Sequence, residues 1–268
     1  MNTTYRTFFG LKKDPFTQDI DRKEILETAA IKGVQSRILH AVEIGASTLL
    51  TGEIGSGKST ALRYVIGGLH PARYTVIYIT ATSGSIIELY RQICQEMNID
   101  LASNSKAVMT KSIKAEVLEL VHKKMNVVLV IDEASLLRLG VFAELHTLTQ
   151  FEQDSKPHLS LVMAGQSNLA DNLRYRASLP LASRVVGRAH LKGVARSEME
   201  QYLDHHLALT GIEHSLFEDN AVTAIHQGSG GLFRKANHLA RGALIAAAKS
   251  KMTMVSAEHV RLAATELF

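Results

Sequence analysis

The chain has 268 residues, of which 46% are apolar and 21% are charged, so it can bury a large core and hold one big domain plus a small one. No apolar run approaches the roughly 20 residues that a membrane-spanning helix needs. Residues 1–6 lack the apolar stretch of a secretion signal. We therefore expect a cytoplasmic protein that makes no membrane contact.

The charge and the special residues exclude several classes of site. The single cysteine, Cys94, leaves no possibility of an intramolecular disulfide or a cysteine-based zinc site. The 12 histidines are scattered without a metal-ligand spacing, which argues against a histidine metal site. A net charge of +4 and a pI of about 9.1 permit contact with nucleic acid without requiring it.

A phosphate-binding loop follows the first predicted strand. The apolar run 47–51 predicts a strand and residues 60–65 have a helical pattern. Between them lies the P-loop pattern, whose residues are Gly52, Glu53, Ile54, Gly55, Ser56, Gly57, Lys58, Ser59 and the following Thr60.

This pattern predicts a bound nucleoside triphosphate. Glycines let backbone N–H groups curl around phosphates, and the next helix adds the positive end of its dipole. Lys58 then reaches the β and γ phosphates and Ser59 holds Mg²⁺. Gly-Ser-Gly is also ordinary turn chemistry, but the complete spacing and the flanking strand and helix favour the P-loop.

Four more apolar runs predict strands at 75–80, 127–131, 159–164 and about 185–191. Helical patterns separate most of them, and these cover about 86–97, 113–125 and 141–152. The first of these helices opens with a capping box, Ser85 to Glu88. This alternation predicts an α/β fold with a parallel sheet of five strands between two layers of helices.

After residue 191 the strand signal stops, and helical patterns cover about 197–210, 218–227, 233–249 and 256–266. A second capping box, Ser197 to Glu200, opens the first of these helices, and glycines separate the later ones. We therefore predict an α/β nucleotide-binding domain over 1–192 and a small all-helical lid domain over 193–268.

The third predicted strand ends in two carboxylates, Asp132 and Glu133, which is the form of a Walker B motif. At the carboxyl end of a strand neighbouring the P-loop strand, Asp132 can hold Mg²⁺ directly or through water, and Glu133 can polarise the attacking water. A solvated acidic turn is the alternative, which the P-loop disfavours. A predicted strand lies in sequence between the P-loop strand and the Walker B strand, and the Walker B strand carries a second acid. In these two features the chain resembles ATPases that have an additional strand and a catalytic glutamate. We expect hydrolysis of ATP to ADP and phosphate, with ATP and Mg²⁺ as cofactors.

Three further residues are candidates for sensing the γ phosphate. Gln166 follows the fourth strand and fits the sensor 1 role, although Asn168 is close enough to compete and Gln166 also suits a turn. Arg234 lies near the start of a lid helix, where it fits the sensor 2 role.

Arg184 precedes the fifth strand, where ring-forming ATPases place an arginine finger that enters the neighbouring subunit's site. Its rivals for this role are Arg174, Arg176 and Arg188. A solvated surface position is the alternative for each of these arginines.

With these parts in this order, the chain resembles the AAA+ ATPases, in the branch that contains the ExeA secretion ATPase and the transposition regulators TnsC, TniB and MuB. Residues 8–16 are similar to the Phe-Gly-Leu-x-x-x-Pro-Phe segment of ExeA-like ATPases, which approaches the nucleotide base. Residues 164–166 resemble their Val-Gly-Gln. Residues 231–234 resemble their Gly-x-Pro-Arg, with Phe233 in place of proline.

The resemblance implies one of two functions. ExeA-type ATPases continue into a membrane helix and a peptidoglycan-binding part, whereas this chain ends at Phe268, so we expect a regulator of DNA transposition. Such a protein assembles into an ATP-dependent ring or filament of its own copies, binds double-stranded DNA without sequence preference, and recruits or activates a transposase. The alternative is an ExeA-like ATPase that assembles an envelope machine without binding DNA.

Small, polar or basic loops lie where TnsC-like proteins face DNA, and they could equally be solvent loops. The residues in them that the resemblance places at DNA are Thr82, Ser83, Ser105 and Lys106. Contacts of this kind to backbone phosphates give sequence-independent, salt-sensitive binding.

Overall fold

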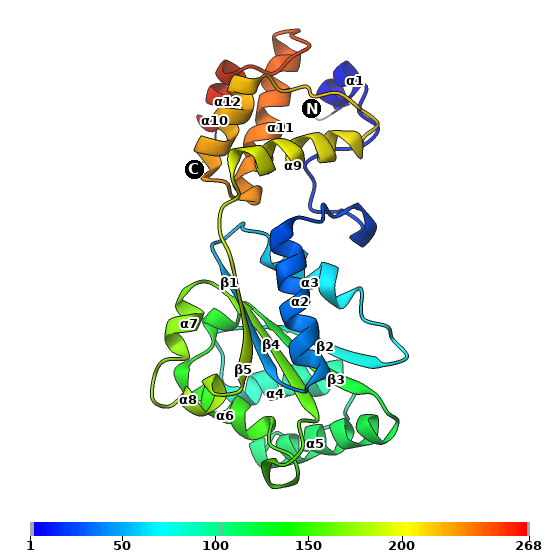
Figure 1. Cartoon of the computed structure of the whole chain (residues 1–268), viewed down its shortest axis with the longest axis vertical. Helices are drawn as coiled ribbons and strands as arrows, with labels where there is room; N and C mark the ends of the chain where they lie inside the picture. Colours follow the sequence, from blue (N-terminus) through cyan, green and yellow to red (C-terminus); the bar gives the residue numbers. More distant parts are fainter. Residues whose placement is uncertain (1–2, 102, 267–268) are drawn as a thin grey trace. The chain divides into compact units, whose positions relative to one another are not determined.

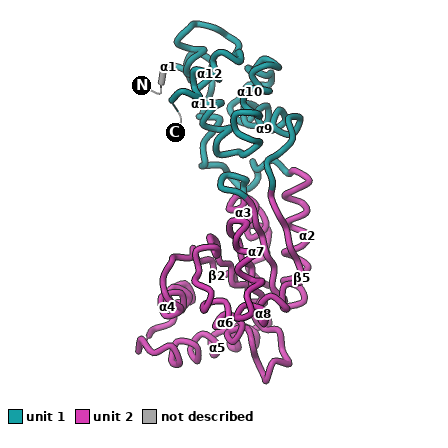
Figure 2. Tube along the Cα trace, turned by 90° about the vertical axis from the view of Figure 1, so that its left-hand side faces the viewer, with its two compact units in different colours: residues 1–27, 53–57, 192–268 teal, residues 28–52, 58–191 magenta. Residues whose placement is uncertain are grey.

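The computed structural model describes residues 3–101 and 103–266. Two compact units can be distinguished (Figure 2), and each is considered by itself. The α/β unit contains residues 28–52 and 58–191, and the helical unit contains residues 1–27, 53–57 and 192–268. No helix among the described residues is long and apolar enough to cross a membrane.

The α/β unit is built on one five-stranded sheet in the order β2-β3-β4-β1-β5 (Figure 1). Every pairing is parallel. The strands are β1 (Ser47–Gly52), β2 (Tyr74–Thr80), β3 (Asn126–Asp132), β4 (Leu159–Gly165) and β5 (Val185–Leu191). The predicted α/β fold with five parallel strands is confirmed.

Helices cover both faces of this sheet. On one face α2 (Ala29–Glu43) contacts β1, β4 and β5, and α3 (Lys58–Ile66) contacts β1 and β4. On the other face lies the main core, to which the remaining helices of the unit contribute. Those helices are α4 (Ile86–Glu96), α5 (Lys106–His122), α6 (Leu139–Leu148), α7 (Asn168–Asn172) and α8 (Leu179–Ala182). The layers are therefore those that the alternation of strands and helices predicts.

The predicted position of the Walker B strand next to the P-loop strand is wrong. The strand that ends in Asp132 does not pair with the P-loop strand, because β4 lies between β3 and β1. The apolar runs give the number of strands but not their order. Inserting β4 places its carboxyl end, which Gln166 directly follows, between the carboxyl ends of β1 and β3.

Several helix boundaries also differ from the prediction. Helix α5 begins at Lys106 rather than near 113, and α6 ends at Leu148 rather than near 152. Residues 152–154 have positive φ values, so a right-handed helix cannot extend to residue 152. Ser85 caps α4 as predicted, with its Oγ accepting a hydrogen bond from Glu88 N at 3.4 Å.

The helical unit contains α1 (Thr3–Phe9), α9 (Arg196–Ala208), α10 (Asp219–Ser229), α11 (Phe233–Lys249) and α12 (Ala257–Ala264). The capping box predicted from Ser197 is wrong, because α9 begins at Arg196 and its N-cap lies two residues before Ser197. Ala195 is the N-cap, and its N–H donates to the Glu198 carboxylate at 3.1 Å. Arg196 is held inside the first turn by its ion pair with Glu200 at 2.9 Å.

The amino-terminal segment belongs to the core of the helical unit. Tyr5, Phe9, Leu11 and Phe16 are buried among side chains of α9 to α12. Main-chain bonds fix the segment as well, since Lys12 N donates to Thr210 O at 3.1 Å. Residues 1–27 are thus part of the helical unit and not of the predicted α/β domain over 1–192, because their aromatic side chains have their apolar partners on the helices.

His206 of α9 is buried against the same segment and predicts a pH-dependent stability. Its Nδ1 donates to Pro15 O at 2.7 Å, and burial lowers its pKa to about 4. Below its unfolded pKa of about 6.5, the unfolded chain binds a proton that folded His206 excludes down to pH 4. The unit therefore loses stability as the pH falls through this window, by up to about 3 kcal/mol.

Thermal melts between pH 7.5 and pH 4.5 test this expectation. His206→Asn keeps an N–H donor near Pro15 but does not titrate, so its melting temperature should fall less over the same range. An equal fall in the variant and the unmodified protein would show that other groups cause the acid sensitivity.

Candidate nucleotide-binding site

The P-loop joins β1 to α3, and its conformation requires glycine. Gly55 and Gly57 have φ values of +85° and +92°, which side-chain-bearing residues rarely adopt. Lys58, the first residue of α3, is buried, and its ammonium donates to Gly52 O at 3.0 Å. In this arrangement the lysine folds back onto the last residue of β1, where the P-loop begins.

Asp132 at the end of β3 receives three hydrogen bonds. Ser59 Oγ and Tyr78 Oη both donate to its Oδ2, at 2.9 and 2.8 Å. Glu133 N donates to its Oδ1 at 2.8 Å. The structure therefore brings together Ser59 and Asp132, which the sequence analysis predicted as the Mg²⁺ residues.

Glu133 has an unusual backbone conformation. Its φ is +53° and its ψ is +30°, in the left-handed region that glutamate rarely occupies. This turn ends β3 sharply and starts the short helix Ala134–Leu136. A strained residue directly after a strand is common at functional sites, which fits the predicted role of Glu133 in polarising water.

The end of β4 is linked to the loop after Glu133. Gln166 N donates to Ser135 Oγ at 3.2 Å, and a Cβ on Gly165 would lie only 2.8 Å from Ser135 N. The predicted sensor Gln166 is thus held beside the Walker B loop by its main chain. Its rival Asn168 is exposed at the first position of α7.

Sequence reasoning missed two residues of this site, Tyr78 and Ser135. Tyr78 lies on β2 and reaches Asp132 only because β2 pairs with β3. Burial, and then its hydrogen bond to Asp132, raise the pKa of Tyr78 well above its usual value, so its hydroxyl stays protonated as a donor. Tyr78 lies two residues before the end of its strand. The sequence alone does not distinguish a tyrosine with a role in the site from one that only packs in the fold.

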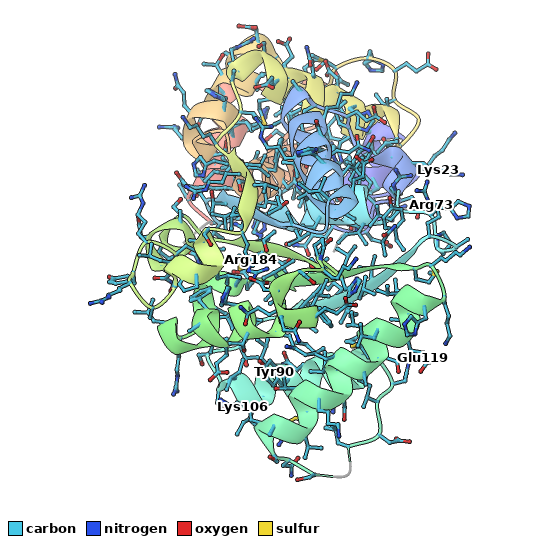
Figure 3. The ribbon with its side chains drawn as sticks, turned by 60° about the horizontal axis from the view of Figure 1, so that its bottom comes forward. Lys23, Arg73, Tyr90, Lys106, Glu119 and Arg184 are labelled. Carbon is cyan, nitrogen blue, oxygen red and sulfur yellow. The ribbon has the colours of Figure 1, made fainter. Side chains whose placement is uncertain are left out.

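Arg184 lies at the opposite edge of the sheet. Its carbonyl accepts a hydrogen bond from Ser47 N, at the amino ends of β1 and β5, whereas the P-loop begins at their carboxyl ends. The side chain, labelled in Figure 3, forms an ion pair with Asp154 and donates from Nε to His146 Nδ1 at 3.1 Å. This bond to Arg184 lowers the pKa of Asp154.

The rival arginines are more exposed. Arg174 forms an ion pair with Asp171 at 3.2 Å, and Arg176 and Arg188 are exposed. The structure does not bring any of these residues, or Arg184, together with Asp132 and Glu133 of the same chain.

Within the helical unit, P-loop residues 53–57 contact the start of α11. Arg234 N donates to Gly55 O at 3.3 Å, and a Cβ on Gly57 would lie 3.4 Å from the Phe233 ring. The hydroxyl of Ser56 is buried without a hydrogen-bond partner among the described residues. The predicted sensor Arg234 thus contacts the loop through its main chain, while its side chain is exposed.

The predicted DNA-contacting residues are exposed; Thr82 and Ser83 lie in a loop, whereas Ser105 is the N-cap and Lys106 the first residue of α5. Thr82 and Ser83 follow β2, and the Ser83 carbonyl accepts a hydrogen bond from Arg138 Nε at 3.2 Å. Ser105 is exposed, and Lys106, labelled in Figure 3, forms an ion pair with Glu144 at 2.6 Å. Contact of Lys106 with a DNA phosphate would therefore compete with Glu144.

Residues 45–173 match the protein-family model described as an AAA domain. General secretion pathway protein A of Aeromonas hydrophila is 30% identical over 266 residues, which are 98% of this chain and 48% of that protein. The chain thus spans about half the length of this relative.

Solved structures resemble the chain as a whole. Cdc6p from Pyrobaculum aerophilum has a TM-score of 0.74 at 15% identity, covering 96% of this chain and 72% of that one. The ORC1 protein of Aeropyrum pernix, solved in complex with DNA, has a TM-score of 0.67 at 18% identity, covering 94% and 68%. At these identities the likeness concerns the fold.

Proposed function

We propose that this chain is an AAA+ ATPase, which binds ATP on the P-loop and hydrolyses it to ADP and phosphate. The match of residues 45–173 to an AAA domain and the five-stranded parallel sheet support this proposal. The observation that carries the proposal is the bond between Ser59 and Asp132, which joins the two motifs at one carboxylate. The unpartnered Ser56 hydroxyl fits a loop that accepts phosphate oxygens.

The residues present fit Mg²⁺. A serine hydroxyl and a carboxylate are hard oxygen ligands, and Mg²⁺ takes few protein ligands because phosphates and waters supply the rest. Ser59 and Asp132 would hold the ion, which would supply charge stabilisation to the phosphate oxygens.

The other site residues have separate roles in this proposal. Lys58 leaves the Gly52 carbonyl to neutralise the β and γ phosphates. Glu133 orients and polarises the attacking water, and Gln166 contacts that water or the γ phosphate. Arg234 reports the γ phosphate to the helical unit, as sensor 2 does.

Arg184 acts on the site of a neighbouring copy, so that hydrolysis requires assembly. Its place at the opposite sheet edge from the P-loop supports this role. Its ion pair with Asp154 has to open before the guanidinium can enter another subunit's site.

For the macromolecular partner, the first candidate is DNA in transposition. Copies of the chain would assemble with ATP on double-stranded DNA, contact phosphates through the loop at 82–83 and the start of α5 at 105–106, and recruit or activate a transposase. The basic pI and a DNA-bound protein of the same fold support this candidate. The second candidate, assembly of a secretion machine without DNA, is favoured by the relative named for the general secretion pathway.

An anisotropy titration with labelled nonspecific duplex DNA separates the two candidates. With a nonhydrolysable ATP analogue we expect binding at low salt that is at least about tenfold tighter than without nucleotide, and that weakens steeply with added salt because it depends on phosphate contacts. Lys58→Ala serves as the control that should lose the nucleotide dependence. No nucleotide-dependent DNA binding at low salt would exclude the transposition candidate and favour the secretion candidate.

A further inference from the structure

Tyr78 reaches the Walker B aspartate from a neighbouring strand. In the parallel register of β2 and β3, Tyr78 pairs with Val130, two residues before Asp132. Because side chains alternate along a strand, Val130 and Asp132 point to the same face of the sheet as Tyr78. The phenol therefore extends along that face toward the carboxyl end of β3, where its hydroxyl donates to Asp132 Oδ2 at 2.8 Å.

The three donors to Asp132 differ in what Mg²⁺ would do to them. Ser59 is itself a proposed ligand of the ion, so its hydroxyl has to serve both the ion and the carboxylate. Glu133 N is part of the main chain and holds only Oδ1. Tyr78 is the donor to Oδ2 that has no role of its own at the ion.

A carboxylate at a strand end can rotate about its side-chain bonds, and each rotamer presents its oxygens differently. Outer hydrogen bonds fix the orientation of metal ligands and raise metal affinity. The hydrogen bond from Tyr78 holds Asp132 Oδ2 in the position where it also accepts the hydrogen bond from Ser59. Without the phenol hydroxyl, Ser59 alone would hold that oxygen.

We propose that Tyr78 is a positioning residue for the Mg²⁺ site, which orients Asp132 by donating a hydrogen bond to the oxygen that also meets Ser59. This inference rests on the proposed function, since it concerns the ion that accompanies ATP. It adds to the P-loop and Walker B motifs a residue contributed by the edge strand β2.

Tyr78→Phe removes the hydroxyl and keeps the ring. Tyr78 is 37% exposed, so its ring is not part of the buried core and the melting temperature should stay within a few degrees. The Mg²⁺ concentration at half-saturation should rise about tenfold, the lower end of the range for outer partners of metal ligands. The readout is Mg²⁺-dependent binding of a fluorescent, nonhydrolysable ATP analogue, which requires no turnover.

Tyr74→Phe is the matched control. Tyr74 lies on the same strand at its amino end, where it pairs with Asn126, so loss of its hydroxyl should leave the Mg²⁺ midpoint unchanged. Asp132→Asn supplies a second test. If Tyr78 acts through Asp132, adding Tyr78→Phe to Asp132→Asn should shift the midpoint much less than it does in the unmodified protein.

The outcomes distinguish this inference from the function on which it rests. A tenfold higher midpoint in Tyr78→Phe alone, lost in the Asp132→Asn background, supports the positioning role. Mg²⁺-dependent nucleotide binding with equal midpoints in Tyr78→Phe, Tyr74→Phe and the unmodified protein overturns it and leaves the ATPase proposal standing. Failure of the unmodified protein to bind the analogue with Mg²⁺ overturns both.

Discussion

Replacing Lys58 with alanine is expected to weaken ATP binding by about a hundredfold or more. The ammonium is buried at the start of α3 and donates to Gly52 O, so it is already held at the carboxyl end of β1, where the P-loop begins. Removing one partner of a buried charge pair costs about 2–5 kcal/mol, because the phosphate charge then lacks its compensation. Isothermal titration calorimetry with ATP and Mg²⁺ measures the change directly.

The matched control is Lys111→Ala, which removes an exposed lysine from α5. Its ATP affinity should equal that of the unmodified protein. Lys58→Ala with undiminished ATP affinity would mean that the nucleotide binds elsewhere, since a residue folded into the loop cannot be irrelevant to ligands of that loop.

Glu133→Gln is expected to separate binding from turnover. The amide keeps the size of the side chain but cannot accept the proton of the attacking water, so kcat should fall by about 100- to 1000-fold. ATP affinity should change by less than about threefold, because Lys58 and the loop remain. Phosphate release measures kcat, and the same calorimetry measures affinity.

Stability is not expected to change in this variant. Glutamine at position 133 has to adopt the same left-handed backbone conformation as glutamate, so the variant and the unmodified protein have the same backbone strain. Glu43→Gln, an exposed change on α2, serves as the control for loss of a negative charge. Normal phosphate release by Glu133→Gln would move the catalytic role to another residue.

The elements of the sheet could be predicted because their signals are local. Each strand is a short apolar run, and the P-loop and the Walker B acids occupy consecutive positions. The sequence alone therefore places Lys58 and Ser59 at the start of the helix after the first strand, and Asp132 at the end of the third strand. The order of the strands depends on pairings between distant segments. For that reason the insertion of β4 beside β1 was not foreseen.

The unpredicted parts of the site depend on register in the same way. Tyr78 reaches Asp132 because β2 pairs with β3. Arg184 forms its ion pair with Asp154 and its hydrogen bond with His146, both of which are distant in the sequence. The amino-terminal aromatic residues pack on helices about 200 positions away along the chain. Composition and periodicity describe each of these segments but not its partner.

The peptide group of Gly55 belongs to the proposed phosphate-binding loop and also caps the start of α11. Leu232, the residue before α11, makes no side-chain cap, and the Gly55 carbonyl accepts the main-chain N–H of Arg234 instead. A lost helix cap typically costs about 1 kcal/mol. If phosphate binding rotated the Gly55 peptide group, the amino-terminal end of α11 would lose this cap. The loss would not depend on which side chain occupies position 234. An arginine-to-alanine change there would therefore remove only the contribution of the guanidinium and leave this main-chain linkage intact.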